Sequence, residues 1–319
     1  MPSTGLPYGV SFLVTLYNKG PYVEQTLLGI LGQDLSCPSE IVICDDGSTD
    51  DSAEIARAVI ARHPQADWTY FRTANAGPAL ATNRAAKRAK LRFLKPIDAD
   101  DFLAPGATRL LLSILEARPA ASLVFGATVG VDHQTSAPLS EKTDWPSLDA
   151  SDVRPFPAES LRQRMIFGPS GMLFPTEKFF AGGGCDEDVF VQDYSLALNL
   201  SRVGEMYETR QPVCYAPHAV DGRLNGSPQH YHDMNLAMAN HLGRADLSAR
   251  DAAQATARCL GRAIKFRRRH RGGGAMIRPR FDYLAAKLGL PIDHVAAIRR
   301  SLPLFGAVRR AIPPLDAAG

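Results

Sequence analysis

The 319-residue sequence lacks several features that define common protein classes. Its five cysteines are odd in number, widely spaced and without a C-x-x-C pair, so neither a disulfide framework nor a zinc site is predicted. Residues 1–9 hold no basic region followed by an apolar run, so no signal peptide is expected. No apolar run reaches the ~20 residues that span a bilayer. We therefore expect a cytoplasmic protein, which could meet a membrane only peripherally, at the inner face of the cell membrane.

The composition is that of a folded protein with an uneven distribution of charge. Hydrophobic residues make up 45% and charged residues 22%, with a formal net charge of +3. One segment near the end is strongly basic, and only Phe266 interrupts it as an aromatic side chain. Poor aromatic interleaving argues against nucleic acid as a partner. The plainest interpretation is a solvated helix end, and the alternative is peripheral contact with an anionic membrane. The cationic residues are Arg262, Lys265, Arg267, Arg268, Arg269 and Arg271.

Strand-like and helix-like segments alternate through the first part of the chain. This rhythm predicts an α/β domain with a mostly parallel sheet flanked by helices. In such sheets ligands bind where strands end at their carboxyl side. No G-x-G-x-x-G follows any predicted strand, which argues against a Rossmann dehydrogenase. The predicted strands are 10–16, 40–44, 68–71, 91–97 and 123–131, with helical patterns between them.

The later part of the chain changes character twice. Residues 132–157 are polar and contain proline, so we expect a long loop or flap there. Beyond about residue 226 an alanine-rich helical pattern replaces the strands. We therefore predict two units, an α/β domain over 1–225 and a C-terminal helical extension with the basic segment over 226–319. The extension is also a candidate homodimer contact.

Two acidic turns follow predicted strands. Residues 45–50 read D-D-G-S-T-D, and an aspartate at a strand's end can accept a hydrogen bond from a base or a ribose. The same residues are ordinary helix-capping turn residues, and the turn alone does not separate the two interpretations. Residues 98–101 read D-A-D-D. Three carboxylates this close repel one another unless a cation neutralises them, and hard oxygen ligands favour Mn²⁺ or Mg²⁺.

A third acidic position opens a predicted helix. Asp193 lies in Q-D-Y at 192–194, ahead of the apolar residues Leu196, Leu198 and Leu200. A carboxylate there could simply cap the helix. It could also serve as a general base facing the acidic turns.

Taken together, the motifs resemble glycosyltransferase family 2. The resemblance covers roughly residues 8–220 and rests on T-L-Y-N-K at 15–19, D-D-G-S-T-D at 45–50, N-A-G at 75–77, D-A-D-D at 98–101, G-G-C-D-E at 183–187 and Q-D-Y at 192–194. Cys185 replaces the aromatic residue usual in the family. The Q-x-x-R-W signature of processive polysaccharide synthases is absent, so repeated addition with extrusion is not expected.

The resemblance implies that the domain over 1–225 is a glycosyltransferase domain with a GT-A fold, and it implies a role for each matched position. Asp193 is expected to be the catalytic base. Asp98 is expected beside the ribose and diphosphate, with Asp100 and Asp101 nearest the metal and His218 a weaker candidate ligand. The residues expected around the nucleotide are Thr15, Tyr17, Asp45, Asp46, Asn75 and Gly77.

The implied activity is inverting, metal-dependent transfer of a sugar from a nucleotide-diphosphate sugar to an acceptor hydroxyl. UDP is the default nucleotide, and a glycan or lipid-linked acceptor in bacterial surface polysaccharide or glycoconjugate assembly is expected. Two other classes remain open at this point. A nucleotidyltransferase would carry a Gly-rich, basic loop after its first strand, which residues 17–20 do not form. A non-catalytic nucleotide-sugar-binding protein would be expected to lack a carboxylate at the base or at the metal position, and this chain has carboxylates at both.

Overall fold

The computed structural model describes residues 5–131, 142, 144–161, 168–217, 226–270 and 276–309. His218, residues 132–141 and 143 of the predicted flap and the glycine run at 272–274 therefore lie outside the described residues. The first half of the chain contains β1 (Val10–Leu16), α1 (Gly20–Leu31), β2 (Ser39–Asp45), α2 (Ser52–Arg62), β3 (Asp67–Arg72), α3 (Pro78–Ala86), β4 (Phe93–Asp98), β5 (Phe102–Leu103), α4 (Ala107–Glu116) and β6 (Ala121–Val131).

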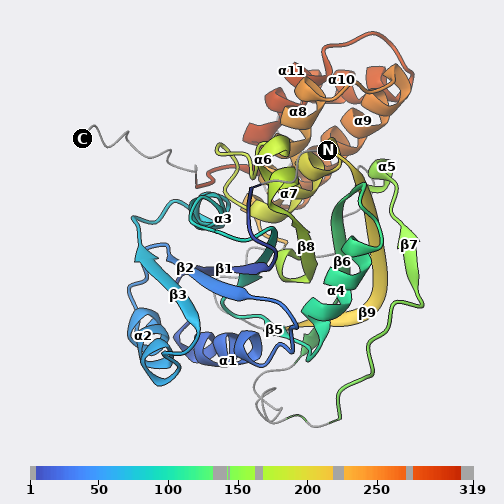
Figure 1. The fold of residues 1–319 in the computed structure, drawn as a ribbon. Helices are drawn as coiled ribbons and strands as arrows, with labels where there is room; N and C mark the ends of the chain where they lie inside the picture. The colour runs from blue at the N-terminus through green and yellow to red at the C-terminus, as the bar shows by residue number, and fades with distance from the viewer. Residues whose placement is uncertain are drawn as a thin grey trace.

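The second half begins with short elements and ends in long helices (Figure 1). The elements are β7 (Val153–Pro155), α5 (Ala158–Leu161), the 3₁₀ turn η2 (Pro169–Gly171), β8 (Met172–Pro175), α6 (Thr176–Gly182), α7 (Gln192–Leu200), β9 (Glu205–Pro217), α8 (Pro228–Arg244), α9 (Ala249–His270), α10 (Ile277–Lys287), α11 (His294–Ser301) and η3 (Leu302–Phe305).

A single sheet in the order β3-β2-β1-β4-β8-β6-β9-β5 organises the fold, with β7 paired to β9. The first four strands in this order are parallel, and their register aligns Leu16 with Asp45 and Thr15 with Asp98. The two acidic turns therefore lie at the same, carboxyl-terminal end of the parallel strands. Because all seven residues of β1 are buried, its continuous apolar sequence suits a strand covered on both faces.

The predicted α/β class is confirmed, and beyond β4 the sheet becomes mixed. Strand β8 runs antiparallel to both β4 and β6, whereas β6 and β9 are parallel.

Strand β4 contains Lys95 and Pro96, an unusual pair for a central strand. Strand β8 pairs only with Phe93 and Leu94 of β4, so Pro96 lies beyond this antiparallel ladder. Lys95 is fully buried and donates to the backbone oxygen of Ser170.

Side chains alternate between two apolar clusters on the two faces of the sheet. Leu13, Val42 and Leu94 belong to the cluster shared with α3 and α7. Val14, Ile43 and Ile97 belong to the cluster shared with α1, α2 and α4. Figure 1 shows α1 and α2 on one side of the parallel strands and α3 on the other. The sheet is thus a central layer whose strand ends remain available for a site.

The C-terminal helices form a bundle that meets the sheet domain through α7. Helix α8 packs against α7, α9 and α11, and α10 packs against α9 and α11. This agrees with the helical pattern expected beyond residue 226, whereas the division into two units stays a prediction. Within the described ranges, no helix combines the length and the apolar character needed to cross a bilayer.

Candidate active site

Asp98 is the point at which three distant segments meet. Its Oδ1 accepts hydrogen bonds from the Thr15 hydroxyl at 3.1 Å and from the Gln192 amide at 2.7 Å. Its backbone N–H donates to the Ser170 hydroxyl at 2.9 Å. The Thr15 contact follows from the parallel register of β1 and β4. The Gln192 contact spans 94 residues of sequence and brings the start of α7 to the D-A-D-D turn.

Asp193 follows Gln192 in the first turn of α7. Burial raises the pKa of its carboxyl from 3.8 to about 7, and the negative charges of Asp98 and Asp233 act in the same direction. A hydrogen bond from the Tyr194 backbone N–H, at 2.8 Å to Oδ1, opposes this rise in pKa. A carboxylate with a pKa near the working pH is well matched to accepting a proton in catalysis. The predicted position of the base therefore has suitable electrostatics.

The D-A-D-D turn contains carboxylates in three different settings. Burial and, to a lesser extent, the charge of Asp100 raise the pKa of Asp98 to about 6, against the opposing hydrogen bonds from Gln192 and Thr15. Asp100 forms an ion pair with Lys19, with Nζ and Oδ2 2.7 Å apart. Asp101 is buried, and its charge acts on Lys95 and Cys214. The turn is thus not a uniformly solvated acidic loop.

The chemistry of this turn fits a divalent cation at Asp100. Repulsion between Asp98 and Asp100 raises the pKa of Asp98, and a cation would relieve that repulsion. Within the part of the chain that is described, no group of three or more histidine, cysteine or acidic side chains is preassembled for a metal. Diphosphate oxygens and water would have to complete the coordination shell, as is usual for Mg²⁺ at phosphate-binding sites.

Asp46 connects the two loops expected to hold the nucleotide. Its carboxylate accepts the backbone N–H of Ala76 at 3.0 Å and of Gly77 at 2.8 Å, and Arg84 lies 3.4 Å away. Burial raises the pKa of Asp46, while these hydrogen bonds and Arg84 lower it. Gly77 has a φ of +95°, and an added Cβ would lie 2.5 Å from the Phe190 ring. Only glycine therefore fits this corner of the N-A-G segment.

Asp45 and the remaining predicted nucleotide residues differ in accessibility. Asp45 is completely buried, and its carboxylate accepts the Ser48 backbone N–H and the Tyr70 hydroxyl, each at 2.8 Å. This geometry favours the turn-holding interpretation of Asp45 over direct ligand contact. Tyr17, by contrast, is 37% exposed just beyond β1, and Asn75 is partly exposed. Both can reach a ligand at this edge of the sheet.

The G-G-C-D-E segment holds elements together behind the site. Cys185 exchanges two backbone hydrogen bonds with the Asn83 side chain of α3, each at 2.9 Å. Asp186 is buried and accepts hydrogen bonds from Asn199 of α7 and from Asn240 and Arg244 of α8. The segment therefore fixes α7 against both α3 and the C-terminal bundle.

Four residues near the site make contacts that the sequence alone did not predict. Lys19 and Gln192 lie inside the recognised motifs, so their positions were visible, but their contacts with Asp100 and Asp98 were not. Ser170 and Asp233 carry no sequence signal of this kind. Asp233, on α8, accepts the backbone N–H groups of Phe190 and Val191 at 3.1 and 3.0 Å, immediately before the helix that carries Asp193.

Comparison with known proteins agrees with this geometry. The family model described as Glycosyl transferase family 2 matches residues 11–181. The chain is 28% identical over 207 residues to chondroitin synthase from Escherichia coli, covering 65% of this chain and 28% of that protein. It is 26% identical over 260 residues to the uncharacterized glycosyltransferase EpsJ from Bacillus subtilis, covering 76% of this chain and 73% of EpsJ. The chain thus spans less than a third of the chondroitin synthase.

Solved structures share the fold at low sequence identity. The S. aureus TarS 1-349 structure in complex with UDP-GlcNAc aligns with a TM-score of 0.64 at 16% identity, covering 93% of this chain and 89% of that one. The mannosyltransferase PcManGT from Pyrobaculum calidifontis, in complex with GDP-Man and Mn²⁺, aligns with a TM-score of 0.59 at 19% identity, covering 94% and 86%. The predicted GT-A fold is thereby confirmed. Since the family model matches more than half of the chain, the chain belongs to glycosyl transferase family 2.

Proposed function

We propose that the chain transfers a sugar from a nucleotide-diphosphate sugar to an acceptor hydroxyl with inversion at the anomeric carbon, using Asp193 as the base. The observation that carries this proposal is the 2.7 Å hydrogen bond from Gln192 to Asp98. It brings the start of α7, with its high-pKa carboxylate, to the carboxyl ends of β1 and β4. The family assignment argues against a nucleotidyltransferase. The carboxylates present at both the base and the metal positions argue against a non-catalytic binding protein.

The proposed reaction is a direct displacement. Ionised Asp193 accepts the proton of the acceptor hydroxyl while that oxygen bonds to the anomeric carbon. The bond from the anomeric carbon to the diphosphate breaks on the opposite face, and the diphosphate leaves with the electron pair. Asp98 accepts hydrogen bonds from Thr15 and Gln192 and so holds the end of β1 next to the start of α7. Lys19 supplies positive charge close to where the diphosphate would lie.

Mn²⁺ or Mg²⁺ bound at Asp100 would offset the charge that develops on the leaving diphosphate. Asp101 is the weaker of the two predicted ligands, because its side chain is buried beside Lys95. The crystallised PcManGT complex contains Mn²⁺, which supports a divalent cation in this fold. His218 stays a prediction because it lies outside the described residues.

The donor and acceptor are proposed at the level of class. TarS was crystallised with UDP-GlcNAc and PcManGT with GDP-Man, so nucleotide-diphosphate sugars are the donor class, with UDP as the first nucleotide to test. Similarity to chondroitin synthase supports a glycan acceptor in polysaccharide or glycoconjugate assembly. Thermal-shift measurements with UDP, GDP and their sugars, with and without Mn²⁺, would identify the donor because a ligand of the folded state raises the melting temperature.

The base is tested by Asp193→Asn once a donor is known. Removal of a positioned base lowers the rate about 10²–10⁴-fold, whereas the donor-induced thermal shift should persist because the amide keeps the shape of the side chain. Asp246→Asn, an exposed position after α8, is the matched control and should keep wild-type turnover. Full turnover by Asp193→Asn would remove that residue from the mechanism.

A further inference from the structure

Helix α10 exposes an apolar stripe that no described element covers. Ile277, Phe281, Leu284 and Leu288 are 82%, 57%, 56% and 73% exposed. Their spacing of four, three and four residues places them on one face of the helix and its C-cap. Large apolar side chains in one contiguous row on a surface mark an interaction site more often than single exposed ones do.

Basic side chains border the stripe. On α10 itself Arg278 lies on one flank, and Arg280 and Lys287 lie on the other. Helix α9 packs beside α10 and adds three exposed cations near its end, Lys265, Arg268 and Arg269. We call the stripe and these cations of α9 and α10 the α9–α10 face.

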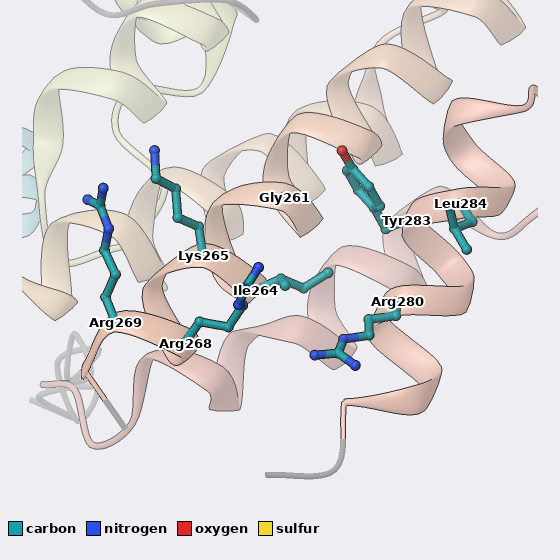
Figure 2. Close-up of a pocket in the computed structure, with 8 residues that line it drawn as sticks. All are labelled: Gly261, Ile264, Lys265, Arg268, Arg269, Arg280, Tyr283 and Leu284. Carbon is teal, nitrogen blue, oxygen red and sulfur yellow. The ribbon is translucent and has the colours of Figure 1, made fainter. Parts of the chain in front are cut away.

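A hollow of about 740 Å³ lies between the two helices. Its lining contains Lys265, Arg268, Arg269 and Arg280, together with Tyr283 and Leu284 (Figure 2). Figure 2 shows the Arg280 side chain reaching from α10 back toward α9. None of the described residues that line it carries a carboxylate. The nearby Asp282 is buried and is held by Arg278 and Arg300.

We propose that the α9–α10 face docks the protein on an anionic lipid bilayer. An amphipathic helix with apolar side chains flanked by cations inserts its apolar row at the level of the headgroups, while the cations meet lipid phosphates. The hollow between α9 and α10 is lined by positive side chains and can receive an anionic headgroup. The surface therefore offers both contributions to binding, apolar burial and charge.

Charge complementarity favours a bilayer over a second copy of this chain. A twofold contact through this face would bring Lys265, Arg268, Arg269 and Arg280 of one copy against the same cations of the other, and like charges across an interface are unfavourable. Carboxylates do occur in the neighbouring groove, where Glu159 and Asp251 are among the lining residues. The apolar stripe is bordered on both sides by cations instead.

Vesicle sedimentation with the full chain tests the proposal. The protein should pellet with vesicles that contain phosphatidylglycerol and remain in solution with vesicles of phosphatidylcholine alone. The triple change Lys265→Gln/Arg268→Gln/Arg269→Gln should lower the partition coefficient by about fivefold per cation. Phe281→Ser/Leu284→Ser should lower it more than tenfold, because two apolar side chains no longer leave water.

Two controls separate docking from general effects. Lys87→Gln/Arg202→Gln/Arg210→Gln removes the same charge from exposed positions elsewhere and should sediment more like the wild type than the α9 triple does. Phe180→Ser removes an aromatic side chain that is 49% exposed on α6 and should sediment like the wild type. Circular dichroism and melting temperature establish that each variant is folded.

Three results would overturn the proposal. The first is no pelleting, or equal pelleting with both kinds of vesicle. The second is loss of binding in the control triple as large as in the α9 triple. The third is a wild-type dimer in light scattering that Phe281→Ser dissociates, which would make this face a contact between copies. Because none of these measurements uses a sugar donor, they are independent of the proposed transferase mechanism.

Discussion

Replacing Asp193 by asparagine should stabilise the donor-free protein while it abolishes transfer. Burial raises the pKa of Asp193 to about 7, so at neutral and alkaline pH the folded state holds a carboxylate that would be more stable in water. Asparagine has nearly the same shape, and its side-chain oxygen can still accept the Tyr194 backbone N–H. It carries no charge, so the unfavourable desolvation disappears. A catalytic carboxylate that is ionised in a buried position lowers the stability of the fold, which is an exchange of stability for activity.

The size of the effect follows from the pKa. A rise from 3.8 to about 7 corresponds to at most ~4 kcal/mol at about 1.36 kcal/mol per pKa unit. Asp193 is partly exposed, and solvent screening reduces this figure, so we expect a gain of about 1–3 kcal/mol in the free energy of unfolding. In a chain of this size the melting temperature should rise by about 1.5–4.5 °C.

The pH dependence distinguishes this cause from any other. Below about pH 4 both folded and unfolded wild type hold the proton on Asp193, so the two proteins should be equally stable. Between about pH 4 and 7 the unfolded chain ionises first, which makes the wild type lose stability relative to Asp193→Asn as pH rises. Above about pH 7 the difference should be constant. In the active enzyme, kcat/KM should rise over the same range as Asp193 ionises.

The assay is differential scanning fluorimetry from pH 4 to 9, without donor and with EDTA, supported by urea unfolding. Asp246→Asn, at an exposed position, is the control and should follow the wild type at every pH. A melting temperature of Asp193→Asn that is lower than, or equal to, that of the wild type at pH 8 would refute the reasoning. So would a difference that does not change with pH.

Three further substitutions test the site and its support. Gly77→Ala places a Cβ 2.5 Å from the Phe190 ring at a φ of +95°; urea unfolding should show a loss of roughly 2–4 kcal/mol together with weaker donor binding, and wild-type stability would contradict the geometry. Lys19→Met frees Asp100 from its 2.7 Å ion pair, so Mn²⁺ titrated without donor should bind several-fold more tightly; unchanged affinity would remove Asp100 from the metal site. Asp233→Asn deletes a negative charge that raises the pKa of Asp193, so the midpoint of the pH–rate curve should move to lower pH. A fall in rate with an unmoved midpoint would mean that Asp233 acts only through the backbone it holds.

The sequence by itself determined the parallel strands β1 to β4 and the acidic turns that follow β2 and β4. The apolar runs over 10–16 and 40–44 predicted β1 and β2 almost to the residue, because a strand buried on both faces requires a continuous apolar sequence. The acidic turns were predicted at strand ends, and the parallel register brings them to one edge. The strands β5, β7, β8 and β9 were not predicted. The first three have two to four residues, too few for a periodicity, and β9 contains charged residues and prolines.

Only the tertiary structure decided which carboxylates are free and which are used to hold the fold. Asp45 and Asp46 are adjacent in one motif, yet hydrogen bonds from Tyr70 and from the N-A-G segment occupy them. Likewise, the contact of Gln192 with Asp98 joins positions 94 residues apart. Local sequence fixes which groups a segment carries, whereas burial, pKa and partners depend on what the folded chain packs against each group.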